Sequence, residues 1–420
     1  MNRPRLPKLP DWLGRRGSRR PLLLGLALLV AAVVGLAAVL AWPSSRGPGG
    51  AKGSTGKRSA AAKVPAVRVT VKPADRAEDV ALDATVRVGV TEGRIGEVRV
   101  TTPSGDALDG KVTADGHGWA SSAPLAPGTR YKVAVTATDA AGASARRVAS
   151  FTTLTPSREL KASVMPLDGQ SVGVGLPISV WFNHPVPDRA AIERRLKVET
   201  SSGLEGAWRW FSDSEVHFRP KRFWPSGERV TLALDLAGAR AGPGTWGVAD
   251  RTVHFRVGVA RVSTVNVNTH TMKVAVNGKV VKVLPVSTGR DKYPTTNGVH
   301  FVIEKTQDKL MDSATVNIPR NSPDGYYEHV FWSVRISNSG EFVHAAPWSV
   351  GSQGHANVSH GCVNLSTANA QWFFKLAQPG DVVTVVGSPK QPNNWTFGVA
   401  DWNIPWSKWV AGSALDRTTA

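Results

Sequence analysis

The strongest constraint on the fold of this 420-residue chain is an alternation of apolar and polar residues that recurs across residues 66–155. Large apolar residues occupy every second position in short runs such as Val67–Val71, Val86–Val90 and Tyr131–Val135. A period of two places the apolar side chains of a strand on one face. Gly, Pro and Asp separate the runs, as is typical of turns. We therefore expect an antiparallel β-sandwich in this segment.

Residues 156–257 follow the same pattern, for example in Val230-Thr231-Leu232-Ala233-Leu234. Short strands joined by tight turns are typical of immunoglobulin-like sandwiches. The sequence thus predicts two tandem Ig-like domains, at 66–155 and 156–257. A short helix capped by Asp188 is expected within the second. Neither segment holds a cluster of residues suited to catalysis, so we interpret both domains as spacers.

Near the N-terminus, Leu22 to Trp42 form an uncharged run of 21 residues. As a helix this run would measure about 31 Å, which matches the hydrocarbon core of a bilayer. Basic residues precede it, so residues 1–20 are expected in the cytoplasm and everything beyond the run outside. The sequence predicts a membrane anchor at 21–42, although a signal peptide cleaved after Ala41 stays an alternative. Residues 43–65, rich in Gly, Ser, Ala and Lys, are expected to be a flexible linker.

The chain carries a formal net charge of +19, and this charge is unevenly spread. Residues 1–65 contain twelve Lys or Arg and one Asp, which gives +11 and leaves +8 for the other 355 residues. No nucleic-acid-binding motif accompanies the charge, so nucleic acid is not an expected partner. Attraction to an anionic cell wall or membrane face is the expected use of the basic segment.

Cys362 is the only cysteine, which rules out an intrachain disulfide. A thiol becomes a good nucleophile only as the thiolate, and His344, His355 and His360 are candidate bases within eighteen residues upstream. Gly361 would let backbone N–H groups of residues 360–362 face a developing oxyanion. There are two alternatives. The cysteine could be buried and inert. It could also form a zinc site with His344, His355 and His360, although these residues lack the paired spacing that structural zinc sites usually have.

Two runs around the cysteine carry a resemblance. Phe342 to Trp348 read Phe-Val-His-Ala-Ala-Pro-Trp, and Ser359 to Asn364 read Ser-His-Gly-Cys-Val-Asn. With Gly354-His355 between them, these runs resemble the signature of the L,D-transpeptidase family (YkuD-type). Further similar segments are Pro285–Gly289, Lys309–Ser313, Gly325–Tyr327, Asn369–Phe374, Gly380–Asp381 and Asp401–Trp406. The resemblance covers about residues 258–410 and fits best the actinobacterial forms with tandem Ig-like domains.

The resemblance and the residue pattern together predict a mainly β chain that ends in a catalytic β-sandwich at 258–388. Asn277-Gly278 predicts a hairpin, and a helix from Ser366 to about Ala377 is expected after the cysteine. Residues 303–327 lack periodicity and are expected to be a mobile flap. The Trp-rich extension at 389–420 is expected to pack on the catalytic domain, because its four tryptophans need burial.

The resemblance also implies roles for individual residues. Cys362 would be the nucleophile, His344 the general base and the carbonyl of Ala345 the group that orients it. The N–H groups of His360, Gly361 and Cys362 would form the oxyanion hole. Residues expected to bind substrate are Tyr326, Met311, Trp348, Ser359 and Asn364, the last two acting with His360 as supports. Many relatives carry Ser where this chain has Ala345. No metal or other cofactor is expected.

In the implied reaction, the thiol attacks a donor tetrapeptide stem of peptidoglycan, D-Ala leaves, and an amine of a neighbouring stem takes the acyl group in a 3→3 cross-link. Carbapenem β-lactams are expected inhibitors. Hydrolysis of the same acyl-enzyme, as in an L,D-carboxypeptidase, stays open, and so does a non-catalytic wall-binding scaffold. Without a base, the thiol is expected to ionise near its ordinary pKa of about 8.5.

Overall fold

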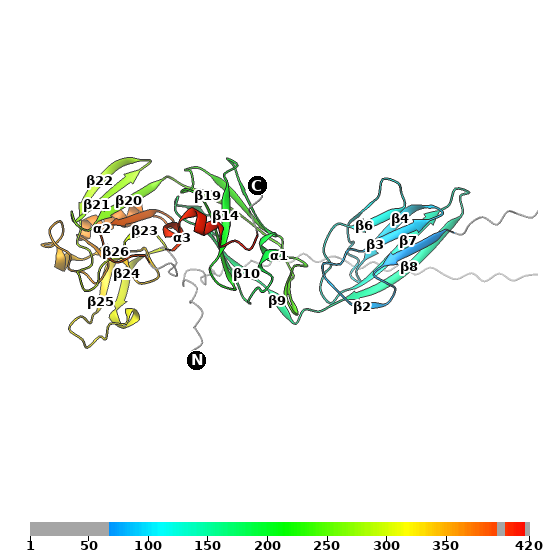
Figure 1. Cartoon of the computed structure of the whole chain (residues 1–420), viewed down its shortest axis with the longest axis horizontal. Coiled ribbons are helices and arrows are strands. Elements are labelled where there is room, and N and C mark those ends of the chain that lie inside the picture. Colours follow the sequence, from blue (N-terminus) through cyan, green and yellow to red (C-terminus); the bar gives the residue numbers. More distant parts are fainter. Residues whose placement is uncertain (1–66, 393–399, 416–420) are drawn as a thin grey trace, which may run out of the picture. The chain divides into compact units, whose positions relative to one another are not determined.

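The structure is a computed structural model that describes residues 67–392 and 400–415 (Figure 1). The predicted cytoplasmic tail, membrane anchor and linker, and Trp395 of the C-terminal extension, lie outside these residues. Over 67–392 and 400–415, none of the helices combines the length and apolar character needed to cross a bilayer.

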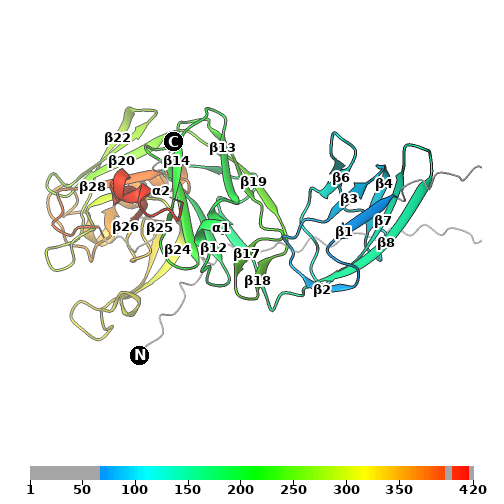
Figure 2. The same cartoon turned by 45° about the vertical axis from the view of Figure 1, so that its right-hand side comes forward.

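The first Ig-like domain consists of two four-stranded sheets (Figure 2). One has the order β1 (Arg68–Lys72), β3 (Arg87–Thr91), β6 (Gly118–Ser121) and β5 (Gly110–Val112). The other has the order β2 (Ala77–Val80), β8 (Ser144–Thr153), β7 (Arg130–Thr138) and β4 (Arg94–Thr101). Along β7, Tyr131, Val133 and Val135 are buried and alternate with more exposed residues, which confirms the predicted period of two.

The second Ig-like domain repeats this plan with a third, smaller sheet. Its main sheets are β10 (Ala162–Met165), β12 (Ile178–Phe182), β15 (Glu215–Pro220) and β14 (Gly206–Trp210), and β11 (Ser171–Val172), β19 (Arg251–Val257), β16 (Arg229–Leu234) and β13 (Leu196–Thr200). The small sheet has the order β17 (Arg240–Gly242), β18 (Thr245–Gly247) and β9 (Arg158–Leu160). The predicted helix is α1 (Arg189–Glu193), and the Asp188 carboxylate accepts the N–H of Ala191 at its start.

The C-terminal domain is built from two sheets and one helix around a shared core. The five-stranded sheet has the order β22 (Lys279–Pro285), β21 (Thr271–Val276), β20 (Arg261–Asn266), β28 (Val382–Val386) and β23 (Gly298–Phe301). The four-stranded sheet has the order β24 (Glu304–Asp312), β25 (Tyr327–Arg335), β26 (Phe342–Ala345) and β27 (Val363–Leu365). Residues of both sheets and of α2 (Thr367–Leu376) belong to one apolar core.

Two local predictions for this domain are confirmed. Asn277 and Gly278 have φ values of +48° and +79° and join β21 to β22 in a two-residue hairpin turn. Helix α2 begins after Ser366, whose hydroxyl accepts the N–H of Asn369, and ends before Ala377. The helix therefore starts and stops where its capping residues indicate.

The prediction of an irregular flap over 303–327 is wrong for its first half. Strand β24 pairs with β25 from Glu304↔Arg335 to Asp312↔Tyr327. The 3-10 turn η2 (Ser313–Val316) and a loop up to Tyr326 connect the two strands. The apolar periodicity is missing because most residues of β24 remain partly or largely exposed, so the ladder depends on backbone hydrogen bonds.

The C-terminal extension packs on more than the expected partner. It contains α3 (Ala400–Asn403), which contacts β23 of the catalytic sheet, and α4 (Trp406–Val410), which contacts β14 of the second Ig-like domain. The indole N–H groups of Trp402 and Trp409 donate to the carbonyls of Gly175 and Ala207, at 2.6 and 2.9 Å. Asn403 bonds to Val299 of the catalytic sheet, and Lys390 Nζ donates to Glu341 of the catalytic domain at 3.2 Å.

A buried arginine holds the C-terminal extension to the second Ig-like domain. The Arg219 guanidinium, in a residue that is 2% exposed, lies 4.8, 5.3 and 4.4 Å from the ring centroids of Trp402, Trp406 and Trp409. It also donates to the carbonyl of Ile404 at 2.9 Å. Cation–π contacts of this kind are strongest where water is excluded. The extension is therefore held to the second Ig-like domain by its aromatic faces.

Candidate active site

The nucleophile candidate and its base candidate come from two neighbouring parallel strands. Strands β26 and β27 pair in the register Val343↔Val363 and His344↔Asn364. Val343 and Val363 belong to the core. Because side chains alternate along a strand, His344 and the residue just before β27, Cys362, are directed to the opposite face of the sheet. The fold thus places thiol and imidazole on one face, away from the core.

His344 is buried, with 4% of its surface exposed, and its Nδ1 lies 2.9 Å from the carbonyl oxygen of Ala345. A carbonyl can only accept, so Nδ1 carries the proton and Nε2 keeps its lone pair. Burial lowers the pKa of His344 to about 4, and the hydrogen bond to Ala345 opposes that effect. The imidazole is therefore neutral at pH 7 and able to take up a proton through Nε2.

Cys362 is half-buried, and its thiol donates to the carbonyl of Gly340 at 3.8 Å. Burial raises the pKa of the thiol to about 12. The expectation of unaided ionisation near pH 8.5 is therefore wrong, because the surroundings of the sulfur disfavour a thiolate. Reaction at neutral pH requires transfer of the thiol proton to a base during the attack.

The turn before the nucleophile is held by two hydroxyl groups. Ser359 Oγ accepts the N–H of Gly361 at 3.1 Å and donates to the carbonyl of Cys362 at 2.7 Å. Thr295 Oγ1 donates to the carbonyl of Gly361 at 2.8 Å. Gly361 has φ = +119°, while an added Cβ would meet nothing closer than 3.8 Å, so the backbone angle and not crowding requires glycine.

These contacts revise the expected oxyanion hole. The N–H of Gly361 is already bonded to Ser359, which leaves the N–H groups of His360 and Cys362 as the candidate donors. Ser359 is 7% exposed and Asn364 is 3% exposed, with Asn364 Nδ2 donating to Ser349 Oγ at 3.1 Å. Ser359 therefore supports the backbone of the turn, and Asn364 is held by the side chain of Ser349. Their role in binding substrate stays a prediction.

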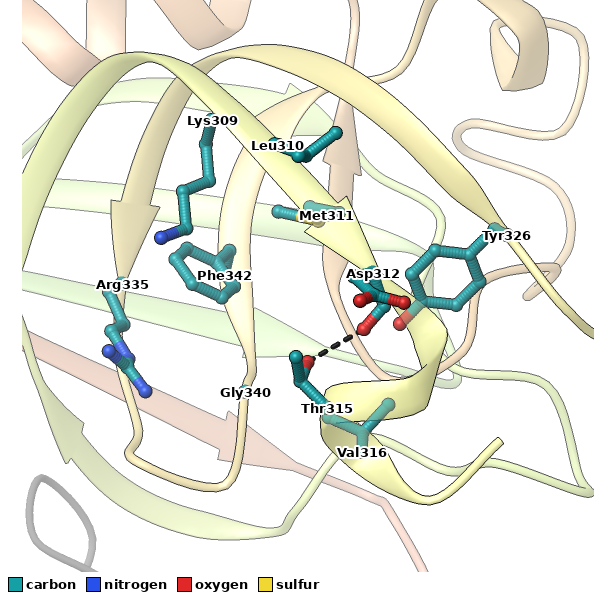
Figure 3. A pocket seen from close by; sticks show the side chains of 10 residues that line it. All are labelled: Lys309, Leu310, Met311, Asp312, Thr315, Val316, Tyr326, Arg335, Gly340 and Phe342. Atoms are coloured by element: carbon teal, nitrogen blue, oxygen red, sulfur yellow. Dashed lines mark hydrogen bonds between the residues drawn. The ribbon is translucent and has the colours of Figure 1, made fainter. Parts of the chain in front are cut away.

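A pocket of about 210 Å³ opens beside Gly340, the carbonyl partner of the thiol. Figure 3 shows Lys309 and Tyr326 approaching it from opposite sides. Its lining comprises Lys309, Leu310, Met311, Asp312, Thr315, Val316, Tyr326, Arg335, Gly340 and Phe342. Burial raises the pKa of Tyr326 to about 12, and Cys362 adds to that shift, so the phenol is a neutral donor close to the sulfur. Two predicted substrate contacts, Met311 and Tyr326, thus line one cavity.

Trp348 and His355 lie outside this pocket lining. Trp348 is 57% exposed, and its ring centroid is 6.2 Å from that of His344. His355 is exposed and follows the 3-10 turn η3 (Pro347–Ser349). Over the described ranges 67–392 and 400–415, no group of three or more His, Cys, Asp or Glu side chains is arranged to hold a metal ion. The zinc alternative finds no support in that part of the chain.

Sequence reasoning missed the charged groups beside His360 and Gly361. Arg290 donates to His360 Nε2 at 2.9 Å and also bonds to Asp324 of the loop before β25. Glu341, which is 4% exposed, accepts from the N–H and hydroxyl of Thr296 at 2.8 and 2.6 Å. These partners are 34 to 70 residues apart in the sequence, so no local pattern could have revealed them.

The comparisons with known proteins agree with this geometry. A model of the L,D-transpeptidase catalytic domain matches residues 260–385, and one of a bacterial Ig domain matches 77–240. L,D-transpeptidase 2 of Mycobacterium tuberculosis is 38% identical over 401 residues, covering 96% of this chain and 97% of its own length. L,D-transpeptidase 5 of the same species is 36% identical over 365 residues, covering 85% and 79%. A solved LD transpeptidase in complex with imipenem is 39% identical, with TM-score 0.49, covering 55% of this chain and 100% of that one.

The matched catalytic domain and the named relatives make this chain an acyltransferase. Its relatives extend that assignment over nearly the whole chain, Ig-like domains included. The chain belongs to the L,D-transpeptidase family.

Proposed function

We propose that this enzyme forms 3→3 cross-links in peptidoglycan through an acyl-enzyme on Cys362. The observation that carries the proposal is the pairing of β26 with β27, which directs His344 and Cys362 to one face while Ala345 fixes the tautomer of the base. A pocket beside that face, lined by Met311 and Tyr326, offers room for the donor stem.

In the acylation step, Cys362 Sγ bonds to the carbonyl carbon of the third stem residue while its proton passes to Nε2 of His344. The C–N bond to D-Ala breaks, and the same proton leaves with the D-Ala amine. In the second step an amine of a neighbouring stem attacks the thioester, the C–S bond breaks, and the amine proton returns to sulfur through His344. The N–H groups of His360 and Cys362 stabilise the oxyanion in both steps.

The location we propose rests on the sequence of the N-terminal segment alone. The uncharged run Leu22–Trp42 anchors the chain in the membrane, and the basic residues before it keep the N-terminus in the cytoplasm. The catalytic domain then acts outside the membrane, and the two Ig-like domains give it reach into the wall. We propose that carbapenems acylate the same cysteine.

Intact-mass spectrometry with a carbapenem tests the assignment of the nucleophile. The wild-type chain should gain one adduct, because it has one thiol. The Cys362→Ala variant should gain none. An adduct of equal mass on Cys362→Ala would contradict the proposal.

A further inference from the structure

His360 is held between a loop after β22 and the loop before β25. Arg290, from the first loop, donates to His360 Nε2 at 2.9 Å. The rings of Tyr293 and Tyr326 each lie 5.1 Å from the His360 ring, centroid to centroid. The imidazole is thus fixed by one hydrogen bond and two aromatic neighbours, only two residues before the nucleophile.

The same arginine contacts the loop that carries Tyr326, one of the residues lining the pocket. Arg290 Nη2 donates to Oδ1 of Asp324. The other carboxylate oxygen, Oδ2, accepts from Lys292 Nζ at 2.5 Å and from the Tyr293 hydroxyl at 2.9 Å. Asp324 precedes Gly325 and Tyr326, and Tyr326 lines the pocket. A continuous chain of contacts therefore runs from the pocket loop through Asp324 and Arg290 to His360.

The chemistry of this contact fixes the protonation state of His360. A guanidinium group has donors only, so His360 Nε2 must accept and the ring proton lies on Nδ1. The charged or titratable groups facing the ring are Arg290, Lys292, Asp324, Tyr293 and Tyr326. Burial lowers the pKa of His360, Arg290 and Lys292 lower it further, and Asp324 opposes them. Protonation of Nε2 would break the bond to Arg290 and set two cations against each other.

We propose that Arg290 is a positioning residue of the active site, which keeps His360 neutral with its proton on Nδ1 and ties it to Asp324. The bridge couples the loop carrying Tyr326 to the turn that presents the N–H groups of His360 and Cys362. The position of the loop that carries Tyr326 and the alignment of the oxyanion donors then depend on one residue. This role rests on the proposed acylation of Cys362.

Three variants separate positioning from simple folding. Arg290→Met removes the bonds to His360 and to Asp324. Arg290→Lys keeps the positive charge but lacks the planar guanidinium that can donate to both partners at once. Lys292→Met is the matched control, since Lys292 bonds to Asp324 as Arg290 does, whereas the hydrogen bond to His360 comes from Arg290. The readout is single-turnover acylation of the full chain by a carbapenem between pH 5 and 9, with the melting temperature measured for each variant.

We expect Arg290→Met to acylate about tenfold or more slowly, because small misplacements of reacting groups carry losses of that order. Its rate should also begin to fall at a higher pH than the wild-type rate, because His360 loses the nearer of the two cations that lower its pKa while burial still lowers it. Arg290→Lys should restore the pH profile but only part of the rate, and Lys292→Met should stay within about twofold of wild type.

A folded Arg290→Met enzyme with the wild-type rate and pH profile overturns the proposal. If that variant does not fold, nitrogen NMR of histidine-labelled wild-type protein decides, with His360 assigned by a His360→Gln spectrum. The proton should lie on Nδ1 at pH 7, and a proton on Nε2 overturns the proposal. A wild type that never acylates contradicts the proposed function instead, since the NMR result needs no activity.

Discussion

His217 lies in a buried ionic contact between the second Ig-like domain and the C-terminal extension. It is 2% exposed, and its ring nitrogens lie 2.7 Å from Asp401 Oδ1 and 3.0 Å from Glu215 Oε1. Burial alone would lower the pKa of His217, but the carboxylates of Asp401 and Glu215 outweigh burial and raise it to about 9. The imidazolium therefore persists at pH 7, where it joins the extension to β15.

This pKa predicts a stability that depends on pH. The difference between about 9 in the folded protein and the ordinary 6.5 corresponds to about 3 kcal/mol of unfolding free energy, at 1.36 kcal/mol per pH unit. Because the folded pKa is the higher one, the stabilisation is complete below pH 6.5 and is lost as the pH rises through 9. Replacing the histidine by a neutral amide should abolish the dependence.

Urea unfolding at several pH values from 6 to 9.5 measures this effect. The stability of the wild type relative to His217→Gln should fall by about 3 kcal/mol across that range. His254→Gln is the matched control, since His254 lies 3.4 Å from Asp168 but is 67% exposed. That control should track the wild type, because exposed pairs contribute little. A constant difference between wild type and His217→Gln would refute the reasoning.

The remaining predictions concern the catalytic domain. His344→Ala should block acylation at neutral pH and show no recovery up to about pH 10, since the pKa of Cys362 is raised to about 12; recovery near pH 8.5 in stopped-flow assays would contradict this. Wild-type acylation should decline only as the pH approaches 4, where His344 becomes protonated, and a decline near pH 6.5 would point to another base. Ala345→Ser should change the acylation rate by less than about twofold, because the backbone carbonyl holds the histidine; a tenfold loss would contradict that role. A chain truncated after residue 399 should melt at a lower temperature than the full chain, since it loses the indole bonds of Trp402 and Trp409.

The sequence was most informative where structure depends on neighbouring residues. Alternating valines, the Asn277-Gly278 turn and the Ser366 cap each act within a few residues, so pattern and outcome agree. The prediction that His344 and Cys362 belong to one site agrees with the structure, because the parallel pairing of β26 with β27 brings the two segments together.

Prediction failed where distant residues decide the structure. The hairpin β24–β25 is polar because much of it stays exposed, and a polar strand has no apolar period to detect. The extension contacts the second Ig-like domain as well as the catalytic domain, because Arg219, more than 180 residues earlier, offers a buried cation to its tryptophans. The bridge from Asp324 through Arg290 to His360 is equally nonlocal.

Mass spectrometry of muropeptides tests the central claim most directly. Purified disaccharide-tetrapeptides would be incubated with the wild-type protein and with Cys362→Ala, and the products sequenced by fragmentation. The account predicts 3→3 linked dimers with release of D-Ala from the wild type and unchanged substrate from the variant. Tripeptide monomers without dimers would show that water and not a stem amine takes the acyl group, and dimers formed by Cys362→Ala would contradict the assignment of the nucleophile.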